Sequence, residues 1–226
     1  MDREITALKA QKKNPNRISV YLDGEYCFGL ARIVAAWLKI GQILSEEDVV
    51  RLKQQDTLEV GYQRALRLLG YRPRSEAEIQ RKLRDQGFED AVIQAVLERL
   101  KQNGFLGDEK FAQDWVENRA TFRPRSKRML AMELRQKGVL DEEIQKALAE
   151  TKDENTLAYQ AAQQYARRLD GVDWETFRKR LGGHLARRGF SYGIIAPVLR
   201  QVWDETHSSA GNENLMENED GILWDK

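Results

Sequence analysis

Apolar residues and glycines recur along this chain with a period of 51 residues. Six positions repeat in three copies: Ile79, Leu130 and Leu181; Leu83, Leu134 and Leu185; Gly87, Gly138 and Gly189; Phe88, Val139 and Phe190; Ile93, Ile144 and Ile195; Leu97, Leu148 and Leu199. Neighbouring apolar positions of one copy lie four residues apart, which is the spacing of one face of a helix. The pattern therefore predicts a tandem helical repeat, an architecture that typically binds an extended partner on one face.

Capping signals divide each copy into three helices. In the first copy they predict helices over 62–70, 75–86 and 90–103, and Ser75 with Glu78 forms a capping box at the second of these. Gly87 follows that helix, where a left-handed residue is most easily a glycine. The second copy repeats this plan with helices that begin at Asp108, Ser126 and Asp141. In the third copy Pro197 should kink the last helix or delay its start.

The residues ahead of the repeats predict a small sheet. Asp23 and Gly24 separate two alternating runs, 17–22 and 25–30, and Asp-Gly favours the type I′ turn of a β-hairpin. The segment 5–11 supplies a third strand. Such a sheet needs a cover, and we expect a helix capped by Ser45, over about 45–56, to pack back onto it.

The predicted fold is mainly α, with three tandem three-helix repeats in an elongated array behind a small β-hairpin and helix extension. We place the extension at 1–60, the repeats at 61–104, 105–153 and 154–205, and a disordered acidic tail at 206–226. The tail is polar and lacks helical periodicity.

The net charge of +1 conceals an uneven distribution. Residues 1–61 are neutral, residues 62–203 carry 27 basic and 20 acidic side chains, and residues 204–226 carry one basic and seven acidic ones. Basic repeats suggest nucleic acid or an acidic protein groove as partner; solvated helix faces explain the charge equally well.

Composition limits the other functions. No apolar run is long enough to span a bilayer and no secretory signal precedes the repeats, so we expect a cytoplasmic protein. One cysteine and two histidines offer no metal site, and we expect no cofactor. Gly182 and Gly183 lack the context of a phosphate-binding loop. The chain is predicted not to be an enzyme.

The string Arg-Pro-Arg-Ser occurs at 72–75 and again, 51 residues later, at 123–126. Proline and serine suit a helix start, whereas two arginines there are disfavoured by the helix dipole. We therefore favour an anionic partner over solvated charge. The candidate binding residues are Arg72, Arg74, Arg123, Arg125, Lys127, Arg128, Arg178, Lys179, Arg180, Arg187 and Arg188.

Aromatic residues precede both copies of this string. Tyr71 and Phe122 could stack on unpaired bases, or pack into the core beside the helix cap. Core packing is the more frequent role of such residues, and we expect it here.

The stretches GYRPRSEAEIQRKLRDQGF and NGFLGDEKFAQDWVENRATFRPRSKRMLAMELRQKGV resemble the bacterial regulatory protein RecX family. The resemblance covers about residues 60–203. It rests on the Arg-Ser helix start, the Leu-x-x-x-Gly helix end and the GFLGDEKFA link between repeats. The third copy departs from it at Pro197 and at Phe177, which stands where the first two copies have serine.

The resemblance implies a modulator of the RecA recombinase in homologous recombination, DNA repair and the SOS response. Family members bind the groove of the RecA–single-stranded DNA filament, block its growth, and reduce ATP hydrolysis and strand exchange. We expect a monomer with the filament and single-stranded DNA as partners and no membrane partner. Two alternatives are a helical repeat that binds nucleic acid without a recombinase and a scaffold for some other protein.

Overall fold

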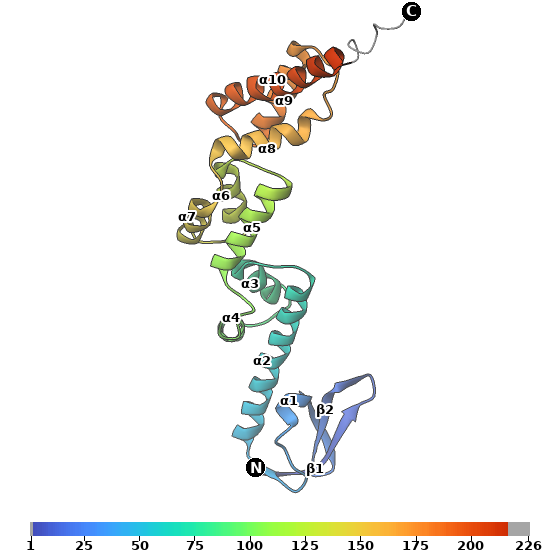
Figure 1. The fold of residues 1–226 in the computed structure, drawn as a ribbon. Coiled ribbons are helices and arrows are strands. Elements are labelled where there is room, and N and C mark those ends of the chain that lie inside the picture. Colours follow the sequence, from blue (N-terminus) through green and yellow to red (C-terminus); the bar gives the residue numbers. More distant parts are fainter. Residues whose placement is uncertain (1, 217–226) are drawn as a thin grey trace, which may run out of the picture. The chain divides into compact units, whose positions relative to one another are not determined.

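The fold was analysed in a computed structural model that describes residues 2–216, with side chains for residues 2–206. The chain divides into two compact units, Met1–Gly107 and Asp108–Lys226. The first contains an antiparallel sheet and one three-helix repeat, and the second contains two three-helix repeats (Figure 1). The predicted class, mainly helical with an N-terminal hairpin, is confirmed.

The sheet has four strands in the order β3-β2-β1-β4: β1 (Arg3–Gln11), β2 (Asn14–Leu22), β3 (Glu25–Ala31) and β4 (Ile43–Leu44). Its buried face includes Ile5, Val20 and Leu30 and packs against residues of the short helix α1 (Arg32–Ala35) and of α2 (Glu46–Tyr71). The two-residue strand β4 is too short for the alternation pattern to reveal it.

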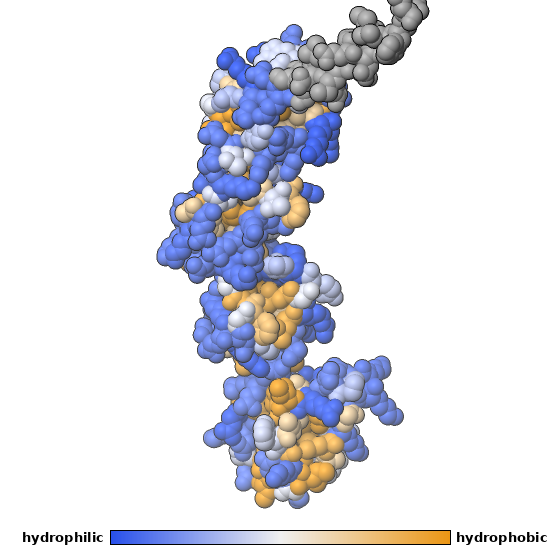
Figure 2. All heavy atoms as spheres, viewed as in Figure 1, coloured by the Kyte–Doolittle hydropathy of each residue, from blue (hydrophilic) through white to orange (hydrophobic). Residues whose placement is uncertain are grey.

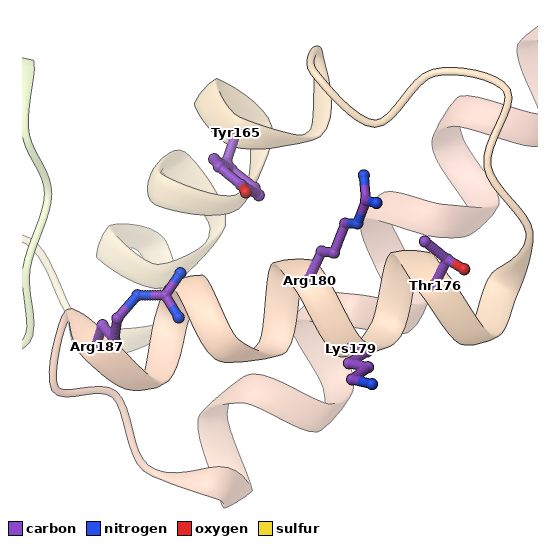
Figure 3. Close-up of a pocket in the computed structure, with 5 residues that line it drawn as sticks. All are labelled: Tyr165, Thr176, Lys179, Arg180 and Arg187. Carbon is purple, nitrogen blue, oxygen red and sulfur yellow. The ribbon is translucent and has the colours of Figure 1, made fainter.

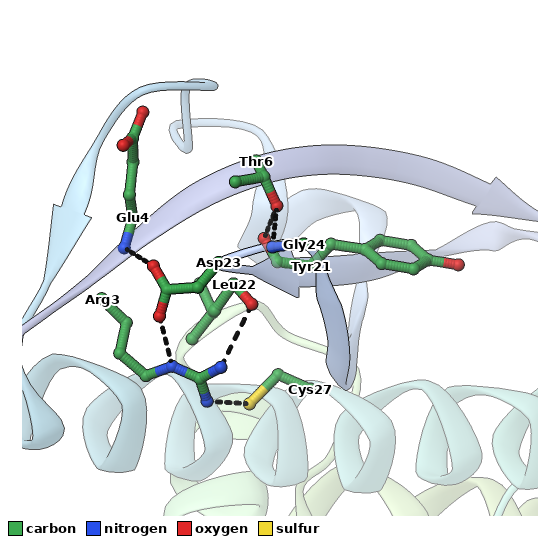
Figure 4. Close-up of polar contacts among 8 residues, drawn as sticks. All are labelled: Arg3, Glu4, Thr6, Tyr21, Leu22, Asp23, Gly24 and Cys27. Carbon is green, nitrogen blue, oxygen red and sulfur yellow. Dashed lines mark hydrogen bonds and ion pairs between the residues drawn. The ribbon is translucent and has the colours of Figure 1, made fainter.

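The Asp23–Gly24 turn has the predicted conformation, with φ of 50° and 89°. Three bonds from β1 hold it (Figure 4): Glu4 N donates to Asp23 Oδ1 at 2.9 Å, Arg3 Nε to Asp23 Oδ2 at 2.8 Å, and Gly24 N to Thr6 Oγ1 at 2.9 Å. The hydrogen bonds and the Arg3 guanidinium hold the pKa of Asp23 below its usual range.

Helix α2 crosses the predicted boundary at residue 60. We expected separate helices over 45–56 and 62–70, but one helix runs through both and serves the sheet and the first repeat. Gly61 lies inside this helix, and a Cβ at that position would lie 3.1 Å from Val96 Cγ2 and 3.3 Å from Phe88 Cε1. A glycine at this position lets α2 and α4 approach closely.

The first repeat is completed by α3 (Glu76–Arg84) and α4 (Asp90–Gln102). Its core includes the recurring residues Ile79, Leu83 and Ile93, all fully buried. The second repeat comprises α5 (Asp108–Phe122), α6 (Lys127–Gln136) and α7 (Asp141–Glu150), with Leu130, Leu134 and Ile144 in the same places. The 51-residue period is therefore the period of the core.

The third repeat comprises α8 (Glu154–Ala166), α9 (Trp174–Arg187) and α10 (Tyr192–Met216). Its core includes Ala120 of α5, so the second and third repeats share buried surface. Pro197 lies inside α10 and does not delay its start. The same helix covers residues 206–216, which we had assigned to a disordered tail; residues 217–226 lie outside the described part of the chain.

Helix α9 begins differently from α3 and α6. Its cap is Asp173, whose side chain accepts a bond from Thr176 N, and not the residue at the 51-residue spacing. That residue, Phe177, is buried in the core. Consequently Arg178, Lys179 and Arg180 lie in the second turn of the helix and not at its start.

Candidate binding surface

The first Arg-Pro-Arg-Ser turn joins α2 to α3 and uses both of its arginines internally. Arg72 donates two bonds of 3.0 Å to the Glu78 carboxylate and a third to Pro73 O at 2.9 Å. Arg74 Nε donates to Leu68 O at 3.1 Å. Ser75 and Glu78 form the predicted capping box. The Glu78 carboxylate therefore caps the helix and also raises the pKa of Arg72, chiefly through its hydrogen bonds.

The second copy, between α5 and α6, pairs a different arginine. Arg125 binds Glu133, which also accepts from Trp115 Nε1 at 2.9 Å and Arg119 Nε at 3.0 Å. Met129 stands where the first repeat has Glu78, so Ser126 caps α6 without a reciprocal carboxylate. Arg123, the counterpart of Arg72, is exposed and makes no side-chain hydrogen bond or ion pair within the described residues.

The second Arg-Pro-Arg-Ser turn, residues 123–126, lies against the α9–α10 connection of the third repeat. Ser126 N donates to Arg188 O at 3.0 Å, and Arg188 Nη1 donates to Pro124 O at 2.7 Å. A Cβ on Gly189 would come within 2.5 Å of Ser126 Oγ, and the φ of Gly189 is +89°. Arg188 is thus engaged in holding the two repeats together.

Lys127 and Arg128 complete the basic start of α6. Lys127 donates from Nζ to Leu148 O at 3.0 Å and from its backbone N to Glu154 Oε2 at 3.2 Å. Arg128 is exposed. Six candidate cations are exposed without a side-chain partner in the part of the chain described: Arg123, Arg128, Arg178, Lys179, Arg180 and Arg187.

Three of these cations line one open pocket of about 390 Å³ in the third repeat, together with Tyr165 and Thr176. Figure 3 shows Arg180 and Arg187 extending from α9 toward α8, which carries Tyr165. Arg180 and Arg187 are seven residues apart and hence on one face of the helix. Lys179 also lines the pocket.

Charge repulsion shows which cations lie near the contact between the two repeats. Burial, followed by the charges of Arg125 and Arg123, lowers the pKa of Arg188. The pKa of His184 is lowered to about 4, first by burial and then by Arg188, Arg187 and Arg168. The neutral imidazole accepts a bond of 2.7 Å from Arg188 Nε and stacks on Tyr165 at 4.0 Å between ring centroids. Arg188 therefore lies close enough to Arg123 and Arg125 for their charges to repel each other, and His184 lies close enough to Arg187 to be affected by its charge.

The sequence missed Tyr165 and Thr176. The residues 51 positions earlier are Asp114 and Arg125, so neither belongs to the repeated pattern. The assignment of Tyr71 and Phe122 to the core was wrong. Their exposed fractions are 79% and 68%, and each ring lies at the last residue of its helix.

Other chemistry is not evident in the described residues. Within residues 2–206 no group of three or more His, Cys, Asp or Glu residues could hold a metal ion. In that same range no helix is long and apolar enough to cross a membrane. Figure 2 shows hydrophobic residues gathered on one face of the first unit. The exposed large apolar residues of its segment 33–43 are Ile33, Trp37, Ile40 and Ile43.

A four-stranded sheet, three three-helix repeats and a basic surface define a helical-repeat protein. Four family models match this chain, one after another along the sequence. Residues 3–45 match the regulatory protein RecX N-terminal domain. Residues 62–100, 108–148 and 152–199 match the first, second and third three-helix domains of RecX. The chain belongs to the regulatory protein RecX family.

Individual relatives agree. The regulatory protein RecX of Bacillus licheniformis is 31% identical over 215 residues, which is 93% of this chain and 82% of the relative. That of Mycolicibacterium smegmatis is 40% identical over 142 residues, covering 59% and 74% of the two chains. A crystal structure of regulatory protein RecX matches with a TM-score of 0.66 and 26% identity, over 85% of this chain and 96% of that one.

Proposed function

We propose that this protein is a non-enzymatic, cytoplasmic regulator of the RecA recombinase that acts as a monomer. It binds the RecA–single-stranded DNA filament in its groove and inhibits filament growth, ATP hydrolysis and strand exchange. Membership of the RecX family supports the recombinase as partner. The observation that carries the mode of binding is the set of exposed, unpartnered cations in the second unit, from Arg123 to the pocket with Arg180 and Arg187.

Unpartnered cations suit this function because a filament presents DNA phosphates and acidic side chains together. Exposed arginines lose little internal stabilisation when they bind an anion, since none of these has to leave a side-chain partner among the described residues. Arg72 and Arg125 are different, because each would have to leave a carboxylate. We therefore assign filament binding first to Arg123, Arg180 and Arg187 and only secondarily to the engaged arginines.

A charge-reversal experiment tests this proposal. Arg180→Glu with Arg187→Glu should weaken co-sedimentation with preformed filaments and relieve inhibition of ATP hydrolysis by tenfold or more. The matched control is Arg67→Glu with Arg200→Glu, which changes the net charge equally at two exposed arginines outside the pocket. Full inhibition by a folded Arg180→Glu, Arg187→Glu protein, or equal loss in the control, would remove the pocket from the mechanism.

The alternative is a helical-repeat protein that binds DNA without a recombinase, and the exposed Phe122 beside Arg123 favours it. Parallel sedimentation with bare single-stranded DNA separates the two. For a protein that binds only DNA, the logarithm of the binding constant falls by about 0.7 per neutralised phosphate for each tenfold increase in salt concentration. If that binding accounts for all inhibition, the recombinase is not a direct partner.

A further inference from the structure

Two exposed aromatic rings occupy the same position in the first and second repeats. Tyr71 ends α2 and Phe122 ends α5, 51 residues later, and both precede an arginine. Large apolar side chains normally gain about 1.5–3 kcal/mol on full burial. Exposure at one site is unremarkable. Folding does not explain exposure at the same site of two repeats in which recurring apolar residues such as Ile79 and Leu130 are fully buried.

The surrounding residues suggest what the rings bind. One ring is a tyrosine and the other a phenylalanine, so the shared property is the flat face and not a hydroxyl hydrogen bond. Arg123, beside Phe122, is exposed and unpartnered among the described residues, and Arg188, with Arg187 beyond it, continues the positive charge. Flat rings within a basic surface are the features by which proteins bind single-stranded nucleic acid, where bases stack and phosphates contact cations.

We propose that Phe122 stacks on a base of single-stranded DNA, and that Tyr71, which occupies the equivalent position of the first repeat, does the same. This deepens the proposed function and rests on it for the nature of the nucleic acid. Phe122 carries the larger effect, because Arg123 is available to a neighbouring phosphate while Arg72 is held by Glu78. The third repeat lacks such a ring. Phe122 lies four residues before the helix cap Ser126, and the residue four before the third cap, Asp173, is the buried Leu169.

The test measures direct binding of the full chain to a fluorescent oligo-dT in the absence of recombinase. Phe122→Ala should weaken binding about fivefold or more, the range that loss of one stacked base predicts. Phe122→Tyr and Phe122→Trp should retain affinity because they keep a flat ring. Phe122→Ala should leave the salt dependence unchanged, whereas Arg123→Ala should lower its slope by about 0.7.

Two controls identify the base as the ligand. The difference between wild type and Phe122→Ala should disappear on a strand of abasic residues and on blunt duplex DNA, where no unpaired base is available. Tyr192→Ala serves as the matched substitution, since Tyr192 is exposed (79%, against 68% for Phe122) but has no aromatic counterpart at the 51-residue spacing. It should bind like the wild type.

The outcomes separate this inference from the proposed function. If Phe122→Ala binds oligo-dT like the wild type, base stacking is refuted, and a loss confined to recombinase filaments would assign the ring to a protein contact. If the wild type fails to bind filaments while Phe122-dependent binding of oligo-dT persists, the proposed function fails and the stacking site stands.

Discussion

The two Arg-Pro-Arg-Ser turns share four residues, a buried serine cap and the helices on either side, yet they hold different arginines. In the first turn Glu78 binds Arg72. In the second, Met129 replaces that carboxylate and Glu133 binds Arg125, which leaves Arg123 exposed. A repeated motif therefore does not repeat its side-chain contacts; the carboxylate that follows it decides which arginine it binds.

The largest effect is expected where the second turn meets the third repeat. Gly87 and Gly189 both have positive φ, but a Cβ on Gly87 meets open space whereas one on Gly189 lies 2.2 Å from Met129 Cγ and 2.5 Å from Ser126 Oγ. Gly87→Ala should cost about 1–2 kcal/mol of unfolding free energy from the backbone conformation alone. Gly189→Ala should cost roughly 1–3 kcal/mol more from the clash.

Urea unfolding of the two variants measures this difference. Equal losses would contradict the close contact between Gly189 and the second turn.

Exchanging the residues at the equivalent positions 78 and 129 tests the comparison of the two Arg-Pro-Arg-Ser turns directly. Glu78→Met removes a nearly buried carboxylate that binds Arg72 and completes the capping box, so the first repeat should lose about 1–3 kcal/mol of stability. Thermal or urea unfolding measures it. A conservative Glu78→Gln variant should lose less, since the amide retains one acceptor.

The reverse exchange should affect binding more than stability. Met129→Glu offers Arg123 the partner that Arg72 has and completes a capping box with Ser126, a gain of at most about 1 kcal/mol. Affinity for single-stranded DNA should fall several-fold, because Arg123 becomes engaged and a negative charge is added. Met129→Gln, which adds the hydrogen-bonding group without the charge, is the control in the same titration. Unchanged affinity in Met129→Glu would show that Arg123 does not contact DNA.

The smallest effect concerns pH. His184 is neutral in the folded protein because its pKa is lowered from 6.5 to about 4, and its Nε2 accepts the bond from Arg188. The unfolded chain takes up a proton at about pH 6.5 and the folded chain only near pH 4. Stability is therefore fully present above pH 6.5 and declines as the pH falls toward 4.

His184→Gln should flatten this part of the stability profile relative to the wild type. Parallel urea unfolding between pH 7 and 4 measures it, and superimposable profiles would contradict the assignment.

The sequence determined the helices, their caps and the repeated core, because these depend on spacings within a single repeat. Apolar residues four apart, Ser75 with Glu78, and Asp23 with Gly24 each specify local structure. Two boundaries were missed: α2 is continuous, although we divided it at residues 57–60 where no breaker stands, and α9 begins at Trp174, because the third cap is an aspartate outside the 51-residue spacing.

Tertiary structure decided which of the predicted cations are held by carboxylates of the chain. Charge and spacing identified Arg72, Arg123 and Arg125 alike, and only side-chain geometry showed that Glu78 binds Arg72 and Glu133 binds Arg125. It also placed Tyr165 in the basic pocket and Tyr71 and Phe122 on the surface. The physical reason is that a helix pattern reports which face is apolar, whereas the partner of a charged or aromatic side chain at a helix end depends on residues brought near by folding.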